Sequence, residues 1–120
     1  MIGIDIDDVE RFDCSEKFLA KIAYEDEIAH IERAKCDSLR KQRVASLFSA
    51  KEAVMKALGL GKTSGVSFKD IKMSHDESGK PFVEVFGIAK QALEERYNGK
   101  KIEISLSHTP TTVVAVAVII

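Results

Sequence analysis

Residues 113–120 constrain the fold most strongly, because every one of them is valine, alanine or isoleucine. A strand that does not alternate between polar and apolar residues usually has both faces covered. The run is far shorter than the roughly 20 residues that span a bilayer. It therefore predicts a strand that is central in its sheet, buried in an oligomer, or both.

The composition indicates one ordinary soluble domain covering residues 1–120. The net charge is −1, so overall electrostatics predicts neither a nucleic-acid partner nor a membrane partner. The first residues carry acids instead of a basic segment, which argues against a signal peptide. Cys14 and Cys36 are not spaced as a metal or disulfide motif. We expect a cytoplasmic protein.

The hydrophobic periodicities predict an α+β fold, in which helices pack on a mainly antiparallel sheet. Helical spacing and capping residues predict the helices, and period-two alternation predicts most strands. The predicted strands are 2–6, 68–73, 80–85, 102–107 and 113–120, and the predicted helices are 15–22, 25–31, 37–58 and 88–98.

The first predicted strand carries a candidate functional acid. Asp5 and Asp7 lie on the face opposite the isoleucines at positions 2, 4 and 6. Considered alone, this pattern favours a half-solvated strand with its acids pointing outward. A functional carboxylate is the alternative interpretation.

The long predicted helix places charge beside its apolar stripe. Lys51 and Glu52 lie next to Leu47 and Met55 on the helical surface. Charged side chains are rarely buried unless they are paired or bind a ligand. An exposed pair between Glu52 and Lys56, worth a few tenths of a kcal/mol, is the structural alternative.

Two other segments could contact phosphate. Arg40, Lys41 and Arg43 form a basic cluster, which is either a solvated helix face or the best local anion site. His108 ends a predicted strand and is followed by Thr109. A lone histidine in such a position is more often a hydrogen-bonded core residue than a catalyst.

Four segments, in order along nearly the whole chain, resemble the signatures of holo-acyl-carrier-protein synthases. They are GIDI at 3–6 with ERF at 10–12, FSAKEA at 48–53 with KALGLG at 56–61, GKP at 79–81, and SLSHT at 105–109. The resemblance implies the 4′-phosphopantetheinyl transferase fold and a homotrimer with active sites at subunit interfaces.

The same resemblance implies a function in fatty acid biosynthesis. The family uses Mg²⁺ to transfer 4′-phosphopantetheine from coenzyme A to a serine of apo acyl carrier protein, and it releases adenosine 3′,5′-bisphosphate. From the residues alone, another metal-dependent phosphoryl transferase or diphosphate hydrolase remains an alternative. A non-enzymatic oligomeric binding module is the second alternative.

The resemblance also implies roles for individual residues. Asp5 and Glu52 would hold Mg²⁺, and Lys56 would face the diphosphate, so these three form the catalytic set. The serine proton would pass either to Glu52 or to a metal-bound water. The implied coenzyme A contacts are Arg40, Lys41, Arg43, Lys56, Lys80, Pro81, His108 and Thr109, and the implied carrier-protein docking residues are Arg11, Lys17 and Lys21.

This chain departs from the family pattern at one position. Leu47 stands directly before the phenylalanine of the central signature, where the resemblance implies an arginine. Arg43 lies one helical turn earlier on the same face, so we expect it to replace that arginine.

Overall fold

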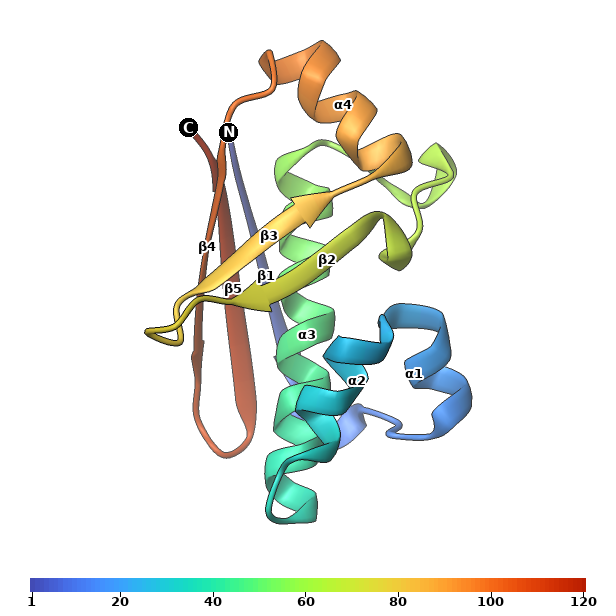
Figure 1. The fold of residues 1–120 in the computed structure, drawn as a ribbon, viewed down its shortest axis with the longest axis vertical. Coiled ribbons are helices and arrows are strands. Elements are labelled where there is room, and N and C mark those ends of the chain that lie inside the picture. Colours follow the sequence, from blue (N-terminus) through green and yellow to red (C-terminus); the bar gives the residue numbers. More distant parts are fainter.

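A long central helix packed against an antiparallel sheet organises the computed structural model, which describes residues 1–120 (Figure 1). The strands are β1 (Ile2–Asp8), β2 (Ile71–His75), β3 (Pro81–Val85), β4 (Ile102–His108) and β5 (Thr112–Ile119). The helices are α1 (Glu16–Ile22), α2 (Glu25–Glu32), α3 (Asp37–Ala57) and α4 (Gly87–Tyr97). The predicted α+β class is confirmed. None of the helices combines the length and the apolar character needed to cross a membrane.

The sheet has β5 at its centre, between β1 and β4, and both pairings are antiparallel. The hairpin of β2 and β3 forms a second, two-stranded sheet. The predicted central position of the apolar C-terminal strand is therefore confirmed. Within this chain only one face of β5 is fully covered, because its residues are alternately buried and half-buried.

The first strand is oriented opposite to the simplest interpretation of its sequence. Ile2, Ile4 and Ile6 are 67%, 60% and 65% exposed, whereas Gly3 is buried. A side chain at Gly3 would place its Cβ only 2.2 Å from the carbonyl oxygen of Ala53, so glycine permits the close contact of β1 with α3. The acids on the Gly3 face consequently point toward α3, and the expectation that they point outward is wrong.

The outward face of β1 continues onto β5. Ile4 lies opposite Val116 and Ile6 lies opposite Val114 in the antiparallel register, so these side chains share one face. The valines are only half-buried. The sheet therefore presents an apolar surface that no element of this chain covers.

The starts of two predicted elements differ in detail from the sequence-based expectation. The residue that precedes α3 is Cys36, whose side chain makes no capping hydrogen bond, so the predicted cap at Asp37 or Ser38 is wrong. The predicted strand 68–73 starts with a 3₁₀ turn instead. Ser67 and Asp70 hold that turn by exchanging side-chain to backbone hydrogen bonds.

A buried ion pair joins the helices to the hairpin. The Lys51 side chain is completely buried, and its Nζ donates to Glu27 Oε1 at 2.9 Å and to the carbonyl oxygens of Ile22 and Phe68 at 2.6 and 3.2 Å. The other Glu27 oxygen accepts from the Met73 amide at 2.8 Å. The sequence placed Glu27 correctly in the first turn of a helix, but its burial and its partner were not predicted.

Replacing Lys51 should test the importance of this pair. Lys51→Met leaves Glu27 buried without its partner, and breaking a buried pair in this way costs about 3–5 kcal/mol. Urea denaturation should therefore show a loss of that order in the free energy of unfolding. Lys72→Met is the matched control, because Lys72 pairs with Asp26 near the surface and such pairs contribute about 0–1 kcal/mol. Equal losses in the two variants would contradict a structural role for the buried pair.

Candidate active site

Two carboxylates from different elements meet between β1 and α3. Asp5 comes from β1 and Glu52 comes from α3. Burial raises the pKa of the Glu52 carboxyl, and the negative charge of Asp5 raises it further. Burial likewise raises the pKa of Asp5. The charge of Asp5 therefore acts on Glu52 in a partly desolvated site. The hypothesis that the two acids form one site expects this proximity.

Asp5 offers one free oxygen atom. Its Oδ1 lies 3.0 Å from Lys56 Nζ, whereas its Oδ2 is buried and has no hydrogen-bond partner. The Asp5 side chain is only 11% exposed. A buried acceptor without a partner is costly unless a ligand completes it.

Lys56 pairs with the strand and not with its own helix. Its Nζ contacts Asp5 and also donates to the carbonyl oxygen of Ile4 at 3.1 Å. No ion pair joins it to Glu52, so the predicted alternative of an exposed pair within the helix is wrong. Lys56 is half-exposed and remains accessible to an anionic substrate.

Asp7 lies on the same face of β1 as Asp5, but both of its carboxylate oxygens already have partners. Its Oδ2 accepts from the Ser49 hydroxyl at 2.9 Å, and its Oδ1 pairs with Arg11 at 2.7 Å. Asp7 also raises the pKa of Asp5. Its role as a support for the site was not predicted from the sequence.

The acid pair fits a hard divalent cation that shares its coordination with a substrate. The chain contains no cluster of three or more metal-ligating side chains, so it has no complete metal cage of its own. Mg²⁺ typically takes one or two carboxylates and fills its other positions with phosphate oxygens and water. The free oxygen of Asp5 and the carboxylate of Glu52 match that ligand set.

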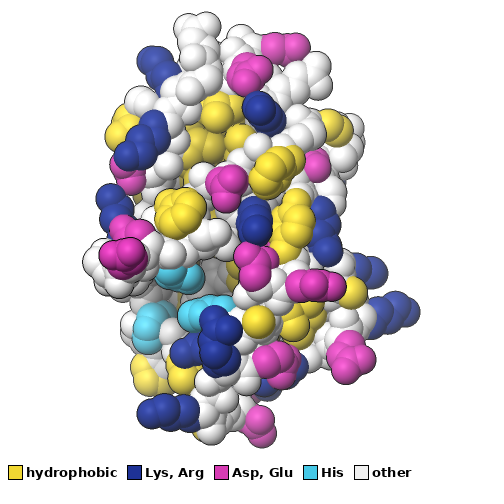
Figure 2. All heavy atoms as spheres, viewed as in Figure 1, with side chains coloured by type: hydrophobic (Ala, Val, Ile, Leu, Met, Phe, Trp, Pro, Cys, Tyr) yellow, Lys and Arg dark blue, Asp and Glu magenta, His cyan; other side chains and the backbone are white.

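A separate cleft of about 730 Å³ opens where α2, α3, β2 and β4 meet (Figure 2). Arg43, Leu47 and His108 line it. Arg43 and Leu47, at the position where the resemblance implies an arginine, therefore face the same space. Asp5 and Glu52 do not line this cleft, so the predicted site residues fall into two groups.

The three basic candidates on α3 differ in position. Arg40 pairs with Glu32 at 2.6 Å, and Lys41 pairs with Glu10 at 3.3 Å. Neither lines the cleft. Only Arg43 reaches it.

The remaining predicted nucleotide contacts lie near the cleft's edge. Lys80 Nζ lies 3.6 Å from Glu103, and Pro81 begins β3. The Thr109 hydroxyl accepts hydrogen bonds from backbone amides of its own turn. Thr109 and His108 share a smaller pocket of about 340 Å³. His108 is exposed, so the interpretation of it as a core residue is wrong.

The predicted docking cations lie together around the first helix. Lys17 and Lys21 are exposed on α1 and make no ion pair. Arg11 lies just before α1, in a 3₁₀ turn, where it pairs with Asp7 and stacks over Phe12.

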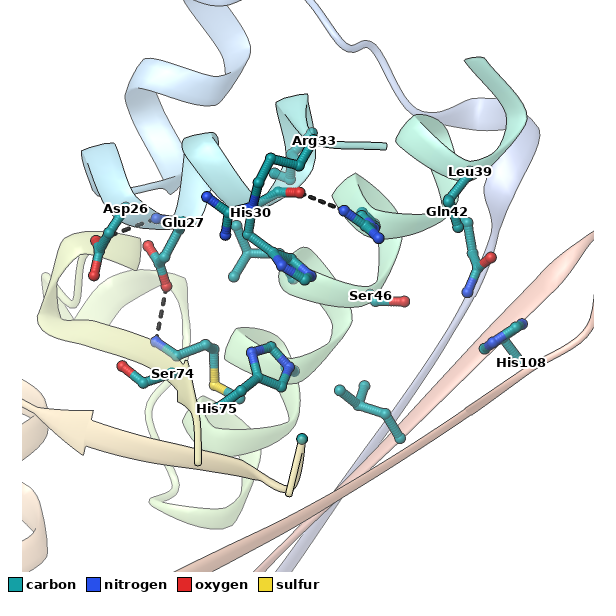
Figure 3. A pocket seen from close by; sticks show the side chains of 17 residues that line it. Asp26, Glu27, His30, Arg33, Leu39, Gln42, Ser46, Ser74, His75 and His108 are labelled. Carbon is teal, nitrogen blue, oxygen red and sulfur yellow. Dashed lines mark hydrogen bonds between the residues drawn. The ribbon is translucent and has the colours of Figure 1, made fainter. Parts of the chain in front are cut away.

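Two cleft residues were missed entirely. His30 from α2 and His75 from β2 line the cleft with ring centroids 5.1 Å apart (Figure 3). Nothing in their local sequence signals this contact, because it depends on how α2 meets the hairpin.

Known proteins resemble this chain in sequence and in fold. Residues 1–116 match the family model of the 4′-phosphopantetheinyl transferase superfamily. The chain is 40% identical over 121 residues to the holo-[acyl-carrier-protein] synthase of Treponema denticola, with 98% of this chain and 95% of that protein covered. The synthase of Clostridium acetobutylicum is 39% identical, with 98% and 94% covered.

Solved structures of holo-[acyl-carrier-protein] synthases resemble this chain in fold. The crystal structure of the Neisseria meningitidis holo-[acyl-carrier-protein] synthase is similar with a TM-score of 0.82 and 30% identity, covering 99% of this chain and 96% of that one. The Helicobacter pylori synthase in complex with coenzyme A has a TM-score of 0.80 and 29% identity, with both chains covered completely.

Proposed function

This chain belongs to the 4′-phosphopantetheinyl transferase superfamily, among the holo-[acyl-carrier-protein] synthases, and we propose that it transfers 4′-phosphopantetheine from coenzyme A to a serine of apo acyl carrier protein in fatty acid biosynthesis. The observation that carries the proposal is the buried, unpartnered oxygen of Asp5 beside Glu52. A binding module would leave its acids solvated, which does not fit the burial of Asp5.

The proposed reaction needs mainly positioning and charge neutralisation. The serine oxygen forms a bond to phosphorus, and the bond from that phosphorus to adenosine 3′,5′-bisphosphate breaks. Lys56 lies close enough to the acids to offset negative charge on the diphosphate. The serine proton would pass either to Glu52 or to a water bound to Mg²⁺. Mg²⁺ held by Asp5 and Glu52 would stabilise charge on the phosphoryl oxygens.

The cleft would hold the nucleotide end of coenzyme A. Its volume of about 730 Å³ lies within the usual range of small-molecule sites. Arg43 and His108 provide the cationic and hydrogen-bonding groups. Solved structures of two relatives contain coenzyme A or its nucleotide part, which supports coenzyme A as the ligand.

The docking face for the carrier protein would be α1. Lys17 and Lys21 are exposed and free of ion pairs, so an acidic surface can approach them without displacing a partner. The attraction between such exposed charges weakens as salt increases.

Mass spectrometry of apo carrier protein incubated with this chain, coenzyme A and Mg²⁺ tests the reaction directly. We expect a gain of one phosphopantetheine that EDTA abolishes. Asp5→Asn should lower the rate on the order of 100-fold or more, the usual cost of losing a group that stabilises transition-state charge. Glu94→Gln is the control, since Glu94 is exposed on α4 and lies outside both β1 and α3. Cleavage of coenzyme A without any carrier protein would favour a diphosphate hydrolase.

Arg43 should contribute more to coenzyme A binding than its neighbours do. Arg43→Ala removes the one basic side chain of its cluster that lines the cleft, so we expect the dissociation constant to rise about tenfold or more. Lys41→Ala removes a cation that faces Glu10, and we expect about a twofold change or less. Calorimetric titration measures both values, and equal effects would contradict the assignment.

The uncovered apolar face of β1 and β5 is the proposed contact between copies in a homotrimer. Ile4→Glu places a charge at the centre of that face and should convert the assembly to monomers in sedimentation experiments. Phe82→Glu is the control, because Phe82 is an exposed apolar residue on the separate hairpin. An unchanged sedimentation coefficient in Ile4→Glu would contradict this interface.

A further inference from the structure

All three histidines of the chain line one cleft, although they come from three different elements. His30 lies on α2, His75 on β2 and His108 on β4. Figure 3 shows His30 and His75 on the α2 and β2 sides of the cleft, with His108 further along it. The ring centroids of His30 and His75 are 5.1 Å apart and the rings are inclined by 32°, so the two imidazoles lie side by side in the cleft.

Two arginines accompany the histidine pair. Arg33 is the C-cap residue directly after α2. Arg43 donates from its guanidinium to the carbonyl oxygen of His30 at 2.6 Å. Neither arginine forms an ion pair with an acidic side chain. Their charges are therefore available to a ligand in the cleft.

The acids near the cleft are neutralised elsewhere. Asp26 pairs with Lys72 at 3.1 Å, and Glu27 pairs with the buried Lys51. Asp76, in the turn after β2, accepts hydrogen bonds from the residues of that turn. Both carboxylates that line the cleft, Asp26 and Glu27, are therefore already paired with a lysine.

We propose that His30 and His75, together with Arg33 and Arg43, form a phosphate site whose affinity rises as His30 takes up a proton. The ligand is a phosphate monoester or diphosphate of the nucleotide part of coenzyme A, so the identity of the ligand rests on the proposed function. Arginine supplies fixed charge and a planar donor pair, and histidine supplies charge that depends on pH.

The surroundings of His30 disfavour its protonated form. Burial lowers the pKa of His30, and the positive charges of Arg43, His75 and Arg33 lower it further. A bound dianion reverses this balance, because it favours the protonated imidazole. Binding near neutral pH is therefore coupled to proton uptake, and the affinity increases as the pH falls. A rise of about one unit in the pKa on binding corresponds to about a tenfold gain in affinity.

Calorimetric titration of the complete chain with adenosine 3′,5′-bisphosphate and with inorganic sulfate tests this linkage at about pH 6 and about pH 8, on either side of the ordinary histidine pKa. Sulfate does not titrate in this range, so its proton exchange reports on the protein alone. We expect about tenfold tighter binding at the lower pH. The heat near neutral pH should depend on the buffer's ionisation enthalpy, with the sign of proton uptake.

Variants distinguish a phosphate-binding role of His30 and His75 from a merely structural one. The double variant His30→Asn with His75→Asn should lose the pH dependence and the proton uptake, while it keeps residual binding through the arginines. His75→Lys carries a permanent charge at an exposed position and should bind at about pH 8 nearly as tightly as the wild type does at about pH 6. Lys90→Gln, on exposed α4, is the control and should match the wild type.

Failure of the inference can be told apart from failure of the proposed function. Phosphopantetheine transfer accompanied by pH-independent nucleotide binding without proton uptake overturns the inference alone. The same holds if the double asparagine variant keeps the wild-type pH dependence. Proton-linked sulfate binding in a protein that transfers no phosphopantetheine supports the site and removes the proposed function.

Discussion

The buried pair of Lys51 and Glu27 is the interaction on which the rest of the structure depends. It fixes the rotation of α3, and the next residue, Glu52, is thereby turned toward β1. It also fixes α2, so that His30, one turn after Glu27, faces the cleft. Lys51 also donates to the carbonyl oxygens of Ile22 and Phe68. One side chain therefore helps to position the elements that carry both groups of site residues.

The acid pair lowers the stability of the fold. Because burial raises the pKa values of Asp5 and Glu52, ionising these carboxyls costs more free energy in the folded chain than in the unfolded chain. Gly3 permits this arrangement, since only a residue without Cβ lets β1 approach α3 so closely. The same orientation turns the isoleucines of β1 outward, which leaves an apolar surface for another molecule to cover.

Local periodicity predicted most elements, including the long helix, the hairpin and the central terminal strand. It could not predict which face of β1 is buried, because alternation shows that Asp5 and Asp7 share a face but not what that face contacts. The pairs Lys51–Glu27 and His30–His75 were missed for a similar reason. Their members are far apart in the chain and meet only through tertiary packing. The acids themselves were identified through the resemblance of four ordered signatures.

The two groups of site residues lie on opposite sides of α3. Arg43 and Glu52 are separated by nine positions, which on an α-helix corresponds to a rise of about 13 Å and a rotation of two and a half turns. A side chain in the cleft and a side chain at the acid pair therefore point away from each other. One coenzyme A cannot easily wrap around the helix to reach both. In the proposed homotrimer, the cleft of one copy would work with the acid pair of another, and the uncovered isoleucine face would thereby contribute to catalysis.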